Sequence, residues 1–228
     1  MYRHVVTLAG FGAWLLMTPV GSAGGIDPVA QGRAVIQGLL KSYAAARSFQ
    51  GSIQVETRLG EKVDIVRMNM WLEKPYGVAF KVLSSSLTPG QAGSKVVWFG
   101  EPNCEVKTSL FGFPVKLSAS CEDPRLAGPR GWTLRETSVR ALMRMVEDPR
   151  TTFRGLGTGT VSGRVMNLVE VRGPAILKGL DREILFIDDK LKLPFAVEGY
   201  DGAERALRLE IESFSFNTAM DPQAFKLD

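Results

Sequence analysis

The chain has 228 residues, of which 45% are hydrophobic, 23% charged and 9% aromatic, and its formal net charge is +4. This is the composition of a globular protein, and it excludes a disordered or collagen-like chain. The single histidine, His4, lies close to the N-terminus. If that segment is removed, a Ser-His-Asp triad, a Cys-His dyad and a His-ligated zinc site are all excluded. Basic residues are spread along the chain, which argues against nucleic-acid binding.

Residues 1–23 are expected to be a cleaved signal peptide. Arg3 supplies positive charge, residues 5–20 are almost wholly apolar, and Gly21-Ser22-Ala23 offers small residues before a cleavage site. The competing interpretation is a membrane anchor, but the apolar run is shorter than the ~20 residues needed to span a bilayer. We therefore expect an exported protein whose residues 24–228 form a single domain.

An N-terminal helix is predicted from Asp27-Pro28 to Arg47-Ser48. Asp27 is suited to the N-cap and Pro28 to the first helical position. Apolar residues then recur at the spacing of one buried helical stripe. The members of that stripe are Ile36, Leu39, Leu40 and Tyr43.

Short strands follow, with alternating apolar and polar residues. Val66, Met68, Met70 and Leu72 share one face of an extended segment. After a turn at residues 74–77, the same apolar face continues in Val78, Phe80 and Val82. The spacing of these strands favours an antiparallel meander over βαβ units.

Cys104 and Cys121 are the two cysteines of the chain. In an oxidising compartment an even number of cysteines indicates a possible disulfide. The alternative is a pair of unpaired buried thiols. A metal site is disfavoured, because two cysteines without histidine provide too few soft ligands.

A second helix is predicted over residues 133–147. Thr133 and Glu136 have the spacing of a capping box, Leu142 and Met145 belong to its inward stripe, and Asp148-Pro149 ends it. The glycine-rich segment 155–159 lacks the Lys-Ser/Thr of a phosphate loop and is interpreted as a turn.

Further strands follow up to residue 216. Near their end, the apolar alternation shifts by one residue after Ser213, which predicts a β-bulge.

Five short motifs, in order along residues 26–228, resemble those of the periplasmic lipoprotein-carrier superfamily, the LolA-like proteins. The motifs are Ser48-Phe49-Gln50-Gly51-Ser52, Met70-Trp71-Leu72-Glu73-Lys74-Pro75, the segment Gly93–Pro102, the segment Leu193–Glu198 and the ending Asp221–Leu227. The resemblance implies a periplasmic protein of α+β, mainly β, class. It implies one strongly curved, unclosed β-barrel of about eleven antiparallel strands, with an N-terminal helix and a lid helix over an apolar cavity.

Two features depart from the family pattern. Carrier proteins usually have an arginine before the proline of the second motif, and this arginine contacts the lid. Lys74 occupies that position here and cannot form a bidentate fork. It is the candidate lid latch. The pair Cys104 and Cys121 is also outside the family pattern.

The expected function is that of a non-enzymatic periplasmic carrier, monomeric and without metal or cofactor. Its ligand would be a lipid or the acyl chains of a lipoprotein, taken from and passed to membrane-associated partners. Ordinary core packing is the alternative role for each of the expected cavity-lining residues. These residues are Val66, Met68, Met70, Leu72, Val78, Phe80, Val82, Leu142 and Met145.

Two other functions remain open. The chain could be an envelope sensor or scaffold that binds another periplasmic or membrane protein through the same fold. An enzyme that uses paired carboxylates is the third and least favoured hypothesis.

Overall fold

The computed structural model describes residues 27–227, with the exception of residues 76, 101, 111–112, 134 and 175. The expected signal peptide, residues 1–23, lies outside the described residues. The helices and strands, in chain order, are α1 (Pro28–Ala45), β1 (Ser48–Leu59), β2 (Lys62–Glu73), β3 (Gly77–Ser85), β4 (Lys95–Trp98), β5 (Asn103–Leu110), β6 (Phe113–Ser120), α2 (Val139–Glu147), β7 (Thr152–Val161), β8 (Arg164–Arg172), β9 (Arg182–Asp188), β10 (Pro194–Asp201) and β11 (Glu204–Phe216).

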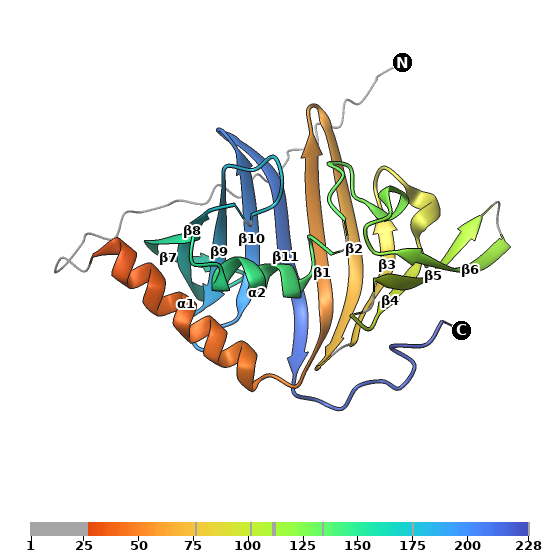
Figure 1. Cartoon of the computed structure of the whole chain (residues 1–228), viewed down its shortest axis with the longest axis horizontal. Coiled ribbons are helices and arrows are strands. Elements are labelled where there is room, and N and C mark those ends of the chain that lie inside the picture. Colours follow the sequence, from red (N-terminus) through yellow and green to blue (C-terminus); the bar gives the residue numbers. More distant parts are fainter. Residues whose placement is uncertain are drawn as a thin grey trace, which may run out of the picture.

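All strands belong to one 11-stranded sheet with the order β6-β5-β4-β3-β2-β1-β11-β10-β9-β8-β7. Every neighbouring pair is antiparallel, and the edge strands β6 and β7 do not pair with each other. Both helices lie across one face of this curved sheet (Figure 1). The predicted class, an α+β unclosed half-barrel with an N-terminal helix and a second helix, is therefore confirmed.

Helix α1 begins where the sequence predicts, because the Asp27 carboxylate accepts a hydrogen bond from the backbone N–H of Val29 at 3.0 Å. The helix packs closely on β7 and β8. A Cβ atom added to Gly32 would lie 2.9 Å from the backbone nitrogen of Gly155. The interpretation of residues 155–159 as a turn was wrong: they lie in β7, where glycine allows the helix to approach the strand.

Helix α2 begins six residues later than predicted. Thr133 and Glu136 do form the reciprocal hydrogen bonds of a capping box, with 2.8 Å from the Thr133 N–H to the Glu136 carboxylate. That box closes a turn. The helix itself is capped by Ser138, whose hydroxyl accepts from the N–H of Ala141 at 3.2 Å. A second good N-cap therefore competes with the first and starts the helix.

The strand register separates an apolar face from a polar face. Partners across β11, β1, β2 and β3 form apolar rows on the face that carries the helices. One row is Ile211, Ile53, Met68 and Val82, and the next is Phe214, Gly51, Met70 and Phe80. Rows of the opposite face are polar, for example Ser213, Ser52, Asn69 and Lys81. The predicted shared face of β2 and β3 is thus confirmed.

The bulge predicted near Ser213 is present, as a register shift between β1 and β11. The predicted pair Cys104–Cys121 forms a disulfide with a Cα–Cα distance of 5.3 Å. Both cysteines are fully buried, in a cluster with Leu72, Val78 and Trp98. The bond ties the end of β6 to β5.

Candidate functional site

One continuous stretch, residues 121–147, leaves β6 and crosses the helix-bearing face of the sheet (Figure 1). The Nε of Arg130 donates to the carbonyl of Arg58 at the end of β1, and its guanidinium pairs with Asp201 at the end of β10. The buried Trp132 donates from Nε1 to the carbonyl of Lys178 at 2.8 Å. These contacts fix the first arm of the crossing at one end of the strands.

The second arm of the crossing is α2. The Arg140 guanidinium donates to the carbonyl of Pro75 at 2.8 Å and lies over the Trp98 ring at 5.3 Å. Val139 packs against the apolar residues of β1–β3, whereas Met143, Met145 and Val146 pack between α1 and the strands β8 and β9. Helix α2 therefore bridges the two halves of the face.

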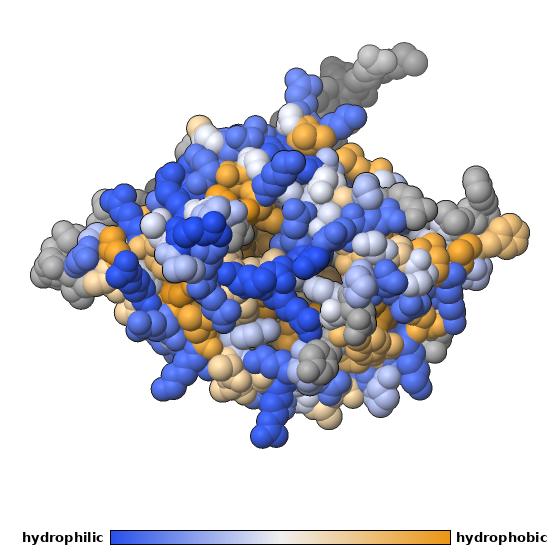
Figure 2. Space-filling model, in the orientation of Figure 1, coloured by the Kyte–Doolittle hydropathy of each residue, from blue (hydrophilic) through white to orange (hydrophobic). Residues whose placement is uncertain are grey.

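Between these two arms the sheet is incompletely covered. Helix α1 contacts β7 and β8 and makes no comparable contact with β1–β3. The face is hollowed near its centre, where apolar residues lie beneath a rim of hydrophilic ones (Figure 2). The half-buried apolar residues of this face in β1, β2, β3 and β11, here called the trough, are Val55, Val66, Met68, Phe80, Val82 and Leu209.

The structure distributes the nine predicted lining residues over three places. Val66, Met68, Phe80 and Val82 lie in the trough, and the buried Met70 lies beside them. Leu72 and Val78 are buried in the cluster around the disulfide. Leu142 and Met145 pack under α1 and are separate from the trough residues. Whether any of the nine contacts a ligand stays a prediction.

Lys74, the candidate latch, holds α1 and makes no described contact with α2. Its ammonium donates to the carbonyls of Tyr43 and Ala44 in the last turn of α1 and lies 3.9 Å from the centre of the Tyr43 ring. A cation is favourable at a helix C-terminus because the carbonyls there carry partial negative charge. Partial burial lowers the pKa of Lys74 from its usual value.

Sequence reasoning missed Arg140, which connects α2 to the same hairpin through Pro75. It also missed Phe195 and Phe214, whose rings meet edge to face at 5.4 Å in the cluster that contains Met70. The shift of the alternation at Ser213 was the available signal for Phe214. No local signal exists for Arg140, because its partner lies 65 residues away.

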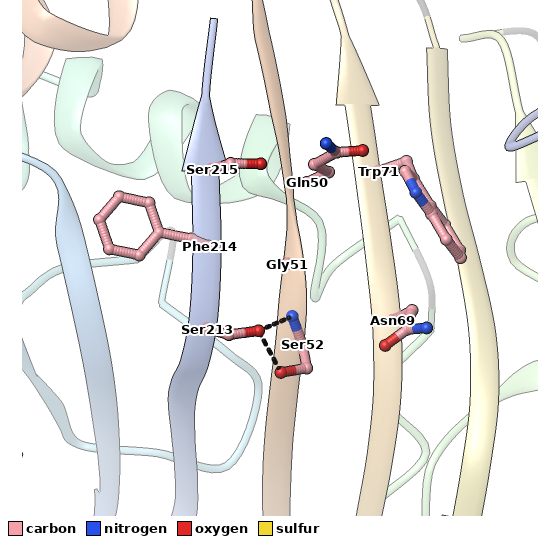
Figure 3. Close-up of a pocket in the computed structure, with 8 residues that line it drawn as sticks. All are labelled: Gln50, Gly51, Ser52, Asn69, Trp71, Ser213, Phe214 and Ser215. Atoms are coloured by element: carbon pink, nitrogen blue, oxygen red, sulfur yellow. Dashed lines mark hydrogen bonds between the residues drawn. The ribbon is translucent and has the colours of Figure 1, made fainter. Parts of the chain in front are cut away.

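Two further hollows lie outside the trough. One, of about 380 Å³, opens on the polar face and is bordered by hydroxyl and amide groups (Figure 3). Its lining is Gln50, Gly51, Ser52, Asn69, Trp71, Ser213, Phe214 and Ser215. The other, of about 550 Å³, lies where α1 meets β1, and it is lined by residues 46–48, Glu73, Lys74 and residues 217–220.

The described part of the chain holds no group of three or more His, Cys, Asp or Glu side chains placed to bind a metal ion. Within the same residues, neither α1 nor α2 is long and apolar enough to cross a membrane. The chemistry that the trough offers is therefore apolar contact, from thioether, aromatic and branched aliphatic side chains.

The fold is LolA-like: an unclosed antiparallel half-barrel whose apolar face is crossed by helices. No family model matches the chain, and no curated protein matches it.

Several solved structures share the fold at low sequence identity. An uncharacterized conserved protein from Thermus thermophilus is 11% identical, with a TM-score of 0.55 over 87% of this chain and 94% of that chain. MucB is 15% identical, with a TM-score of 0.54 over 87% of this chain and 63% of that chain. A LolA superfamily protein from Nitrosomonas europaea is 9% identical, with a TM-score of 0.37 over 86% of this chain and 97% of that chain.

Proposed function

We propose that this protein is a periplasmic carrier that holds a lipid or the acyl chain of a lipoprotein in the trough, without covalent chemistry. The observation that carries the proposal is the incomplete cover of the apolar face. On β8 and β9, under α1, residues such as Val169 and Leu185 have no exposed surface. On β1–β3 the same face keeps half-exposed apolar residues under a hollow.

An acyl chain is the ligand that suits this surface. Burial of each methylene group contributes about 0.8 kcal/mol, so a chain of eight buried methylenes contributes about 6 kcal/mol before the cost of ordering it. The trough needs no charged partner for such a ligand. Arg130 and Arg140 hold the two arms that border the opening, and movement of either arm would let a chain enter or leave.

The test is uptake of a fluorescent fatty acid by the purified protein. The double variant Val66→Gln/Val82→Gln changes two half-exposed trough residues that belong to none of the buried clusters. We expect its affinity for the fatty acid to fall about tenfold or more, because two apolar contacts are replaced by amides.

The matched control is Ile65→Gln. Ile65 is 39% exposed and neighbours Val66 in β2, but it projects from the opposite face. The control should bind the fatty acid as the wild type does. Equal affinity of the double variant and the wild type, or no uptake by the wild type, would contradict the carrier proposal.

The likeness to MucB favours a second candidate function, the binding of another envelope protein. MucB in complex with MucA(peri) matches this chain with a TM-score of 0.51 at 14% identity, over 86% of this chain and 60% of that chain. A protein segment could occupy the trough in place of an acyl chain. Crosslinking in intact envelopes distinguishes the two: a protein complex that survives removal of lipid supports the scaffold.

A periplasmic location fits the buried disulfide, since such bonds persist in oxidising compartments. It also fits the signal peptide expected at residues 1–23. Fractionation of cells that express the full chain tests the location directly.

A further inference from the structure

Four lysines face one another across adjacent strands on the polar face of the sheet. Lys81 of β3 pairs with Lys95 of β4, Lys95 with Lys107 of β5, and Lys107 with Lys116 of β6. With strands about 4.8 Å apart, this lysine row is about 14 Å long. Lys81 and Lys116 are exposed and Lys107 is half-buried.

Such a row is unfavourable in the isolated protein, because like charges directly opposite one another on a sheet repel. Lys95 has a structural role: its ammonium donates to the carbonyls of Gln223 and Lys226 and so holds the C-terminal segment. Lys81, Lys107 and Lys116 form no ion pair within the described residues. Of the residues two positions away along these four strands, Glu105 alone is acidic.

Protection of a sheet edge does not explain the row. Lysines are common on edge strands, where they prevent pairing with other chains. That role suits Lys116 in the edge strand β6, but Lys81 and Lys95 lie in interior strands. Three consecutive lysine pairs are better explained by a partner that supplies negative charge.

We propose that the lysine row docks this protein on an anionic lipid surface. Each lysine near such a surface contributes about 1 kcal/mol, so several together give specific, salt-sensitive attachment. Phe113, at the hairpin end of β6 and about 10 Å from Lys116, is 72% exposed and provides an aromatic side chain for the interface. The charge pattern stands alone, whereas the choice of a lipid surface over another polyanion rests on the proposed function.

The experiment is vesicle co-sedimentation with the full mature chain. Vesicles of pure phosphatidylcholine are compared with vesicles of one part phosphatidylglycerol to two parts phosphatidylcholine. The wild type should bind the anionic vesicles, and binding should weaken as salt rises from about 0.05 to 0.3 M. The variant Lys81→Gln/Lys107→Gln/Lys116→Gln should bind them between about tenfold and a hundredfold more weakly.

The matched control, Lys41→Gln/Lys62→Gln/Lys190→Gln, removes the same three charges from exposed positions elsewhere. It should lose little affinity. The row variant should also melt at or above the wild-type temperature, because repulsion is relieved. A lower melting temperature would make the row a structural feature and overturn the proposal.

Three other results would also overturn it. They are equal binding to both kinds of vesicle, equal losses in the row variant and the control, and preference for soluble polyphosphate over vesicles. Fatty-acid uptake in the absence of vesicles separates the two proposals, since the row variant should retain it. Loss of uptake by the wild type with intact vesicle binding would sink the carrier alone.

Discussion

Single residues connect the separate parts of this fold across long sequence distances. Lys74 reaches the carbonyl ends of α1, Arg140 reaches the β2–β3 hairpin, and Arg130 joins the crossing segment to β1 and β10. Each is a long cationic side chain that donates to backbone carbonyls which would otherwise lack a partner. The identity of the lysine before Pro75 was visible in the sequence, but the helix that it holds was not.

Glu183 is a residue whose environment predicts a dependence of stability on pH. Its side chain is buried in β9, and its carboxylate accepts one hydrogen bond, from the N–H of Leu177 at 3.1 Å. Burial raises the pKa of Glu183 above its usual value, and the hydrogen bond opposes this only in part.

The folded state therefore holds the Glu183 proton more tightly than the unfolded state does. This contribution to stability is full below the unfolded pKa of about 4.3 and is lost as pH rises through the folded pKa. Glu183→Gln removes the dependence and can still accept from Leu177. We expect the melting temperature of the variant to exceed that of the wild type at neutral pH, and the difference to disappear near pH 4.

Thermal melts across this pH range check the prediction for Glu183. Glu204→Gln, the same change at an exposed carboxylate, should shift little. A difference between Glu183→Gln and the wild type that does not change with pH would refute it.

At the scale of elements, the fit of α1 on β7 depends on glycine. Gly32 and Gly38 both lie in α1, but their surroundings differ. A Cβ atom at Gly32 would meet backbone atoms of residues 154 and 155 at 2.9 to 3.0 Å, whereas one at Gly38 would meet the flexible Lys192 side chain at 3.6 Å.

The two glycines predict opposite effects of the same substitution. Gly32→Ala should lower the free energy of unfolding by about 1–3 kcal/mol, because the helix must move off the strand. Gly38→Ala should raise it by about 0.5–1 kcal/mol, because alanine loses less backbone entropy in a helix. Urea denaturation of both variants measures the difference. A stabilising Gly32→Ala would show that the close approach of α1 to β7 is wrong.

At the scale of the whole molecule, the half-barrel has two unequal sides. Strands β7–β10 are covered by α1 and α2 around fully buried residues such as Val169 and Leu185. The side of β1–β6 lacks such cover and is braced by the disulfide and by the C-terminal segment, whose Phe225 contacts the Phe99 ring. The incomplete cover of β1–β3 exposes the trough on one face, and the lysine row lies on the other.

The disulfide should therefore matter to the stability of the whole chain. It closes a loop of 17 residues, for which the chain-entropy model gives about 3 kcal/mol. Cys104→Ala/Cys121→Ala should lower the free energy of unfolding by about 2–4 kcal/mol. Denaturation with and without reductant checks this, since the reductant should weaken the wild type and leave the variant unchanged. Equal stability of the two proteins under oxidising conditions would contradict it.

The sequence by itself determined what depends on neighbours along the chain. Asp27 and Pro28 start α1, the alternation from Val66 to Val82 defines one apolar face, and the shift at Ser213 marks the bulge, because capping and strand alternation are local. Local rules were insufficient for α2, where two N-caps compete, and for residues 155–159, where contact with α1 decides the conformation.

Only the tertiary structure decided where the chain keeps apolar surface and where it gathers charge. Lys81, Lys95, Lys107 and Lys116 are scattered in the sequence and become a row only through strand register. The trough likewise depends on which strands α1 and the crossing segment 121–147 leave uncovered. Both features arise from pairing between distant residues, which no pattern along the chain specifies.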